Sequence, residues 1–193
     1  MTWSFDPLPP LSFDLVMADP PWAFALRSEA GQAKSAQAQY ACMTLDEIAA
    51  LPVAHLARGS CWLWLWATHP TLPDALAVMR AWGFTFVTSG VWSKRGASGA
   101  LAFGTGYVLR CASEPFLIGR IGNPPLGSRS TRTVLEAERG RHSEKPDAAY
   151  EVAERTFLAL RRADLFSRRS RPGWEAWGAE AGKFDAPALQ AAE

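Results

Sequence analysis

The segment Cys61–Ala67 constrains the fold of this chain more than any other part of the sequence. It reads Cys-Trp-Leu-Trp-Leu-Trp-Ala and is apolar throughout. Because successive side chains of a β-strand point to opposite faces of the sheet, a strand with this composition is buried on both faces. Such strands lie at the centre of sheets that helices cover above and below. The segment therefore predicts an α/β architecture, and its tryptophans are first of all a signal of the core.

Strand and helix patterns alternate along the rest of the chain, which favours a three-layer sheet. Strands are expected over residues 13–18, 61–67, 84–87, 91–92, 114–119, 133–135 and 163–166. Helices are expected over residues 44–51, 72–82 and 146–160. The first helix opens with Thr44 and Glu47 at the spacing of a capping box. Two long loops rich in small residues, 93–106 and 122–131, are expected to face one edge of the sheet.

Length and composition favour one compact unit. The chain has 193 residues, so we expect a single domain over 1–193 with a core from about 13 to 180. No stretch approaches the roughly 18 apolar residues of a membrane span, and the first residues lack the plan of a signal peptide, which together predict a cytoplasmic protein. The three cysteines and three histidines show no ligand spacing, so neither a disulfide framework nor a metal site is expected.

The basic side chains are concentrated in the last third of the chain. Residues 120–171 contain twelve Lys and Arg against seven Asp and Glu, whereas residues 1–119 contain seven against eight. A positive field of this kind is compatible with contact to phosphate groups. A solvated Arg-rich surface would give the same count, so both interpretations stay open.

The tetrapeptide Asp19-Pro20-Pro21-Trp22 directly follows the first expected strand. The two prolines fix two φ angles and remove two backbone donors, so carbonyl groups are expected to point outward as unpaired acceptors beside the Asp19 carboxylate. A carboxylate and a carbonyl could accept both N–H groups of an exocyclic amine, with the indole of Trp22 stacked on the base. This is the chemistry that an amine methyltransferase needs. The alternative is an ordinary turn that ends a strand.

Further short motifs follow the tetrapeptide in a fixed order. They are the pair Tyr40 and Met43, the strand end 65–68, the segment 91–94, the pair 106–107 with Arg110 and Glu114, and the segments 145–147, 164–168 and 173–178. With these motifs the chain resembles the adenine-amine methyltransferases related to the catalytic subunit of the eukaryotic mRNA adenosine methyltransferase, a family with many bacterial and phage members. The resemblance covers most of the chain, from Phe13 to about Glu180.

The resemblance implies a Rossmann-like class I fold that uses S-adenosylmethionine. The central sheet would be mostly parallel, and the motif order would be permuted, with the catalytic turn near the N-terminus and the cofactor-binding strand near the C-terminus. The residues implied around the cofactor are Asp19, Lys145, Asp164, Leu165, Arg168, Ala179 and Glu180. Relatives usually carry Asn at the position of Ala179, so a polar contact to the ribose is expected to be missing. Surface roles for Lys145 and Arg168, and a strand end at Asp164, are the alternatives.

The same resemblance implies direct methyl transfer to the 6-amino group of adenine. The catalytic residues would be Asp19, Pro20, Pro21 and Trp22, and the substrate-binding residues Tyr40, Trp92, Lys94, Arg110 and Glu114. The base would be flipped or already single-stranded. Core packing for Trp92 and Tyr40 and a solvated Lys94 stay open. Because Glu114 lies in an apolar strand, it is expected to pair with a cation such as Arg110, and a structural ion pair is as good an interpretation as a substrate role.

The polymer is not decided by these motifs, because DNA and RNA present the same amine. DNA is favoured, since the short chain resembles the bacterial and phage members, and RNA is the alternative. A catalytically silent nucleic-acid-binding subunit and a methyltransferase for small amines are further alternatives. No separate recognition domain is visible, so sequence choice is expected from the loops 93–106 and 122–131, from a homodimer or from a partner chain.

Overall fold

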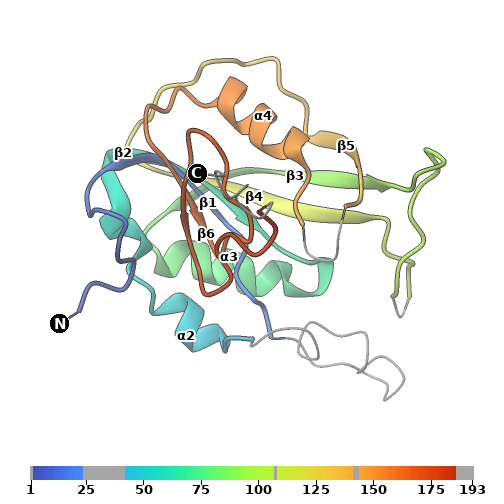
Figure 1. The fold of residues 1–193 in the computed structure, drawn as a ribbon, viewed down its shortest axis with the longest axis horizontal. Helices are drawn as coiled ribbons and strands as arrows, with labels where there is room; N and C mark the ends of the chain where they lie inside the picture. The colour runs from blue at the N-terminus through green and yellow to red at the C-terminus, as the bar shows by residue number, and fades with distance from the viewer. Residues whose placement is uncertain (1, 24–41, 107, 141–143, 186–193) are drawn as a thin grey trace, which may run out of the picture.

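A seven-stranded sheet forms the centre of the molecule in the order β5-β3-β4-β2-β1-β6-β7 (Figure 1). The computed structural model describes residues 2–23, 42–106, 108–140 and 144–185. The strands are β1 (Phe13–Ala18), β2 (Ala57–Trp66), β3 (Thr85–Arg95), β4 (Ser113–Ile121), β5 (Val134–Glu138), β6 (Arg162–Leu165) and β7 (Glu175–Trp177). The helices are α2 (Leu45–Ala49), α3 (Leu72–Ala81), α4 (Asp147–Thr156) and the short 3₁₀ turns Val53–Leu56 and His69–Thr71.

The sheet is mostly parallel, as the sequence predicts. Only β4 runs against its neighbours β2 and β3, and every other pairing is parallel. The ends of β1, β2, β3 and β6 therefore meet at one edge of the sheet, together with the start of β4. We call this the carboxyl edge and the opposite side the amino edge. Ligands of open α/β sheets bind at the carboxyl ends of the strands.

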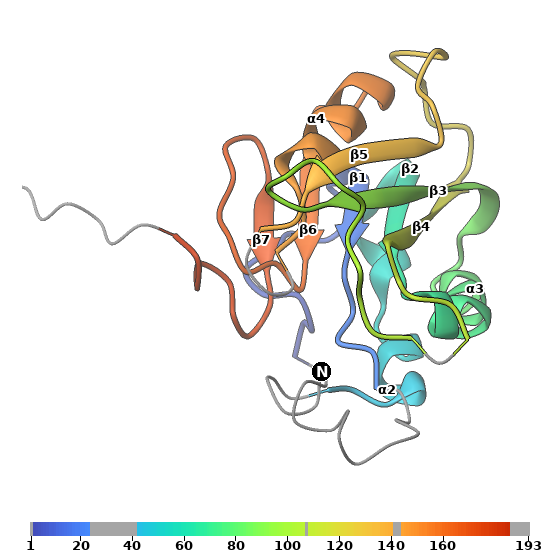
Figure 2. The same ribbon diagram turned by 90° about the vertical axis from the view of Figure 1, so that its right-hand side faces the viewer.

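The central strand β2 divides the core into two halves. Leu63 and Leu65 face a layer that contains α2 and α3, whereas Trp62, Trp64 and Trp66 face a layer that contains α4. Figure 2 shows α4 on one face of the sheet and α2 and α3 on the other. The three-layer α/β architecture expected from residues 61–67 is confirmed. In the described ranges no helix is long and apolar enough to cross a membrane.

Several expected boundaries differ in the structure. The patterns at 84–87 and 91–92 belong to one strand, β3, which continues to Arg95 and so includes the first residues of the expected loop 93–106. Helix α4 ends at Thr156 rather than 160, and Pro146 is its N-cap. Strand β7 was not predicted, because a strand of three half-buried residues carries no hydrophobic period.

The two long loops lie at opposite edges of the sheet, so the expectation that they share one edge is wrong. The segment after β3 lies at the carboxyl edge. The segment 122–131 follows the antiparallel strand β4 and therefore starts at the amino edge, where the Asn123 amide donates to the Ser60 hydroxyl (3.2 Å). The direction of one strand decides this placement, and the sequence alone does not show strand direction.

Candidate functional site

The turn 19–22 leaves the end of β1 and is held by backbone hydrogen bonds. The Asp19 amide donates to the Leu165 carbonyl on β6 (3.2 Å). The Trp22 amide donates to the Pro20 carbonyl (2.8 Å), and the Pro21 carbonyl accepts from Met43 (3.0 Å). The prediction that these carbonyls are unpaired is therefore wrong. A carbonyl oxygen has two lone pairs, so each still has one acceptor position left.

Trp22 is part of the core and does not present its ring as a stacking surface. Its side chain is 6% exposed and packs in the layer that contains Leu65. Its indole Nε1 donates to the Trp66 carbonyl at the end of β2 (3.1 Å). The tryptophan thus ties the turn to β2 and sets where Asp19 stands, which differs from the stacking role that the sequence suggested.

Four charged side chains form a continuous row at the carboxyl edge. The Lys145 ammonium lies 2.9 Å from Asp19 Oδ2 and 2.5 Å from Glu114 Oε1. The second oxygen of Glu114, Oε2, lies 2.6 Å from Lys94 Nζ. We call this row the ion chain Asp19–Lys145–Glu114–Lys94. Glu114 pairs with two lysines, so the expected pairing with Arg110 is wrong.

The ion chain keeps Lys145 and Glu114 charged. Burial alone lowers the pKa of the Lys145 ammonium, but the carboxylates of Asp19 and Glu114 reverse this and hold it above its usual value. Burial raises the pKa of Glu114, yet Lys145 and Lys94 outweigh it, so the pKa lies below its usual value. For Asp19 burial prevails over Lys145, and its pKa is raised. The four charges nearly cancel, which reduces the cost of burying them.

Asp164, at the end of β6, has a different environment. Its side chain is 4% exposed, and Tyr150 Oη donates to its Oδ2 (2.9 Å). The Ser167 hydroxyl, which also contacts the Arg169 carbonyl (2.9 Å), is a second hydrogen-bonding neighbour. Burial raises the pKa of Asp164 to about 6, because these hydrogen bonds offset only part of the desolvation.

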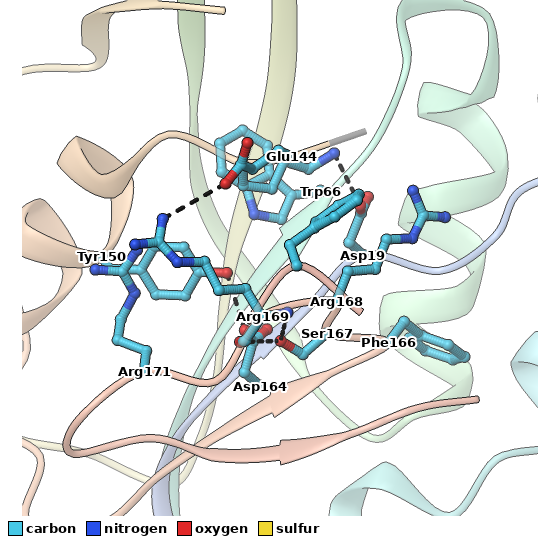
Figure 3. A pocket seen from close by; sticks show the side chains of 12 residues that line it. Asp19, Trp66, Glu144, Tyr150, Asp164, Phe166, Ser167, Arg168, Arg169 and Arg171 are labelled. Atoms are coloured by element: carbon cyan, nitrogen blue, oxygen red, sulfur yellow. Dashed lines mark hydrogen bonds and ion pairs between the residues drawn. The ribbon is translucent and has the colours of Figure 1, made fainter. Parts of the chain in front are cut away.

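Asp19 and Asp164 line one open pocket, shown in Figure 3. Its empty space, including the open mouth, is about 450 Å³. The remaining lining residues are Trp66, Glu144, Lys145, Tyr150, Phe166, Ser167, Arg168, Arg169, Arg171 and Phe184. Arg168 lies on the side of Asp19 and Phe166, while Arg169 and Arg171 lie on the side of Tyr150 (Figure 3).

Sequence reasoning located four pocket residues, Asp19, Lys145, Asp164 and Arg168, and missed most of the wall. Tyr150 lies in the first turn of α4, shortly after the predicted residue Lys145, and Trp66 is the last residue of the predicted central strand. Their positions next to predicted features could have indicated both. Phe184 gave no signal.

The expected ribose region is held by an ion pair. Arg168 Nε lies 2.8 Å from Glu180 Oε2, and Lys183 contacts the other oxygen of that carboxylate. Leu165 is fully buried, so the contribution it makes to the site is its carbonyl, which holds Asp19. Phe166 has a left-handed φ of 63°, a strained conformation that turns the chain sharply after β6.

None of the predicted substrate residues that the structure describes lines the pocket, and only Glu114 and Lys94 are connected to it, through the ion chain. Trp92 is 3% exposed, and its Nε1 donates to the Ala137 carbonyl (3.0 Å), so it packs in the core with Lys94 over its ring. Arg110 is exposed and donates to the Gly106 carbonyl (3.3 Å). Tyr40 lies outside the described residues. No cluster of potential metal ligands occurs in the part of the chain that the structure describes.

The pocket has the groups that a zwitterionic, partly aromatic ligand needs. Buried carboxylates can pair with a cation, Lys145 and Arg168 can pair with an anion, and Phe166 and Phe184 offer apolar surface. The buried Nε1 of Trp66, on the same wall, has no hydrogen-bond partner among the described residues.

Comparisons with known proteins show which sequences this chain is similar to. A family model described as MT-A70 matches residues 13–180. A protein named type II methyltransferase M.MunI, from Mycoplasma sp, is 30% identical over 194 residues, which is 91% of this chain and 81% of that protein. An N(6)-adenosine-methyltransferase MT-A70-like protein of Arabidopsis thaliana is 29% identical over 86% of this chain. The human N(6)-adenosine-methyltransferase catalytic subunit METTL3 is 29% identical over 84% of it. The chain spans only 23% and 27% of those two proteins.

Proposed function

We propose, from the premise that the chain belongs to the MT-A70 methyltransferase family, that it transfers a methyl group to the exocyclic 6-amino group of adenine in DNA. The observation that carries the proposal is the position of Asp19, at the end of β1, in the same pocket as Asp164 and Arg168. This pocket lies where neighbouring parallel strands β1 and β6 end, the usual ligand site of such sheets.

DNA is favoured because the match covers most of the length of the Mycoplasma relative but only a small part of the relatives named as adenosine methyltransferases. The Mycoplasma relative, whose name gives a type II methyltransferase, is matched over 81% of its length. The relatives named as adenosine methyltransferases are matched over about a quarter of theirs, and they make RNA the second candidate. The catalytically silent subunit is a weaker candidate, since the charged groups of the pocket are all present.

S-adenosylmethionine is the proposed methyl donor, and the pocket residues fit it. The raised pKa of Asp164 shows a buried carboxyl without enough positive charge around it, which a cationic ligand would supply. Lys145 and Arg168 suit the ligand's carboxylate and hydroxyl groups, and Phe166 and Phe184 suit its adenine. Glu180 stands beside Arg168, and its carboxylate can accept a hydrogen bond from a ribose hydroxyl group. When bound, this cofactor would supply the methyl group: its bond to sulfur would break, leaving a neutral thioether, as the bond to the adenine nitrogen forms, and that nitrogen would then lose one proton to the Asp19 carboxylate or to water.

The chain's own residues position the amine. The Asp19 carboxylate and the remaining lone pair of the Pro20 carbonyl accept the two N–H groups. Negative charge at Asp19 then lies beside an amine that becomes cationic, which stabilises the transition state. Lys145 holds Asp19 in place through its 2.9 Å contact, and Trp22 acts as a positioning residue through its hydrogen bond to β2. Glu114 and Lys94 complete the charge balance, and Lys94 remains the proposed contact to a phosphate of the flipped or single-stranded adenine nucleotide.

Methyl incorporation tests the proposal directly. The purified protein is incubated with labelled S-adenosylmethionine and matched adenine-containing DNA and RNA oligonucleotides, single- and double-stranded. We expect label in DNA adenine and a loss of about 10²–10³-fold in kcat for Asp19→Asn. The matched control is Asp74→Asn, a half-buried carboxylate in the first turn of α3 that does not line the pocket, which should keep full activity.

Cofactor binding separates the candidates. Calorimetry should detect S-adenosylmethionine binding to the wild-type protein and weaker binding to Asp164→Asn. Incorporation into RNA alone would replace DNA by RNA as the substrate. Binding without incorporation into any oligonucleotide would favour the silent subunit, and an absence of both would overturn the proposal.

A further inference from the structure

A second, larger pocket lies at the amino edge, in the same layer as the first. Its empty space, including the open mouth, is about 710 Å³. It lies between α4, the strands β3 and β4, and the segment 126–133. Trp62 and Trp66 of β2 line one pocket each and stand four residues apart, about 13 Å along the strand. We call it the amino-edge pocket.

The floor of the amino-edge pocket is aromatic. Trp64 stacks on Phe116 with ring centroids 4.0 Å apart, and Trp62 lies against Phe157 at 5.0 Å. Gly90 of β3 makes this possible, because a Cβ there would come within 2.4 Å of the Phe116 ring. These four rings are only 2–6% exposed and pack against one another, so the floor is apolar and fixed in place, and a planar ring would pack against the ring atoms that line the pocket.

The rim is cationic and has no compensating charge. Arg129 and Arg132 line the pocket and are exposed, and neither makes a hydrogen bond or ion pair with the described residues. No carboxylate is among the lining residues, whereas hydroxyl groups of Ser89, Ser128 and Thr131 are. This differs from the first pocket, where Lys145 faces the carboxylates of Asp19 and Glu114. Free guanidinium groups bind phosphate well, since their N–H fork matches its oxygens.

We propose that the amino-edge pocket binds a nucleotide, with the base on the aromatic floor and the phosphate at Arg129 and Arg132. An apolar aromatic floor and a cationic rim are complementary to a ligand that combines a planar aromatic ring with a phosphate group. The nucleotide is either a free mononucleotide or one nucleotide of the substrate strand. Binding of a nucleotide of the substrate nucleic acid rests on the proposed function, whereas binding of a free mononucleotide does not.

Indole N–H signals in NMR spectra give a direct test. Nine tryptophans are few enough to assign with Trp→Phe variants. Cytidine 5′-monophosphate is the probe, and butyl phosphate is its control, with the anion but no ring. We expect the probe to shift the Trp62 and Trp64 signals and to leave the Trp66 signal of the first pocket unchanged. Butyl phosphate should bind about tenfold more weakly.

Variants of the rim and the cavity complete the test. Arg129→Gln or Arg132→Gln should weaken the binding of the probe about tenfold, because each removes a charge-assisted contact. The matched control, Arg80→Gln, removes an exposed arginine on α3 and should change nothing. Val152→Phe, which fills the cavity and keeps the arginines, should abolish the shifts. Circular dichroism verifies that each variant is folded.

The outcomes are distinct. No shift with the probe, equal binding of butyl phosphate, or unchanged binding by Val152→Phe would each overturn the proposal. If Arg132→Gln also weakens the binding of a labelled single-stranded oligonucleotide at fixed salt, the pocket binds a nucleotide of the substrate nucleic acid. If only the binding of the mononucleotide is weakened, the ligand is a free nucleotide. Methyl transfer is not measured here, so a protein that binds the probe but transfers no methyl group would retain this inference and lose the proposed function.

Discussion

Glu114 and Asp164 are both buried carboxyl groups at the carboxyl edge, but their surroundings push their pKa values in opposite directions. Glu114 lies between the ammonium groups of Lys94 and Lys145, and its pKa is lowered. Asp164 lies beside the hydroxyl groups of Tyr150 and Ser167, and its pKa rises to about 6. The Glu114 side chain is 13% exposed and Asp164 is 4% exposed, so both carboxyl groups are largely removed from water. The charge of the neighbour therefore decides whether a buried carboxyl stays ionised.

This difference divides the pocket by its chemistry. On the side of Lys145 the charges compensate one another, so that side is a preformed frame. On the side of Asp164 one carboxylate lacks a full counter-charge, so that side gains most from a cationic ligand. The first side is thus expected to support stability, and the second to support binding at a cost in stability.

Removing the shared cation should have the largest effect. Lys145→Met leaves Asp19 and Glu114 facing each other without compensation, so we expect the free energy of unfolding at pH 7 to fall by about 3 kcal/mol. Urea denaturation measures it. Lys183→Met, which breaks an exposed pair with Glu180, is the matched control and should cost less than about 0.5 kcal/mol. Equal losses in the two variants would contradict the idea of a preformed frame.

Neutralising the other carboxyl should have the opposite sign. Asp164→Asn keeps an acceptor for the Tyr150 hydroxyl and removes the cost of a buried charge, so we expect the free energy of unfolding at pH 7.5 to rise by about 1–3 kcal/mol. The same variant should bind S-adenosylmethionine about tenfold more weakly in calorimetry. Asp74→Asn, which neutralises a half-buried carboxylate outside the pocket, serves as the control. A destabilised Asp164→Asn would show that the carboxylate is already compensated.

The pH dependence sharpens the same contrast. The pKa of Asp164 is about 6 in the folded protein and 3.8 as its ordinary value, so the folded state binds the extra proton between these values. Its contribution to stability is full below pH 3.8 and is lost as the pH rises through 6. The difference in unfolding free energy between Asp164→Asn and wild type should therefore grow from near zero at about pH 4 to at most about 3 kcal/mol at about pH 7. A difference that does not vary with pH would refute this assignment.

The outer end of the ion chain should give the smallest effect. The Lys94 side chain is 27% exposed, so Lys94→Met should lower the free energy of unfolding by only about 1 kcal/mol. The pKa of Glu114 should rise at the same time, because Lys94 is one of the two cations that lower it. An NMR titration of the Glu114 carboxyl checks this. An unchanged pKa would mean that Lys145 alone holds Glu114 ionised.

The elements predicted best were those with a strong local signal. Residues 61–67 form the centre of β2, the capping box at Thr44 and Glu47 is present, and α3 occupies the expected residues almost completely. The errors concern features without such a signal. Strand β7 is three half-buried residues long, and α4 ends four residues early because Phe157 turns extended and packs against Trp62.

The candidate site was predicted in part for the same reason. Asp19, Lys145, Asp164 and Arg168 line one pocket, and local motifs indicated all four. The predicted partner of Glu114, Arg110, was wrong, and so was the expectation that the ring of Trp22 is accessible to a base. Both depend on which strands lie side by side, and a motif does not contain that information.

The amino-acid sequence by itself determined the layers, the strand that ends at Asp19 and the charged residues available at that end, because apolar periodicity and proline chemistry act locally. Tertiary structure decided the rest. The antiparallel direction of β4 brings Glu114 between two lysines and sends the segment 122–131 to the other edge, where arginines meet an aromatic floor. Electrostatic compensation depends on distances across strands, and those distances exist only after the sheet has formed.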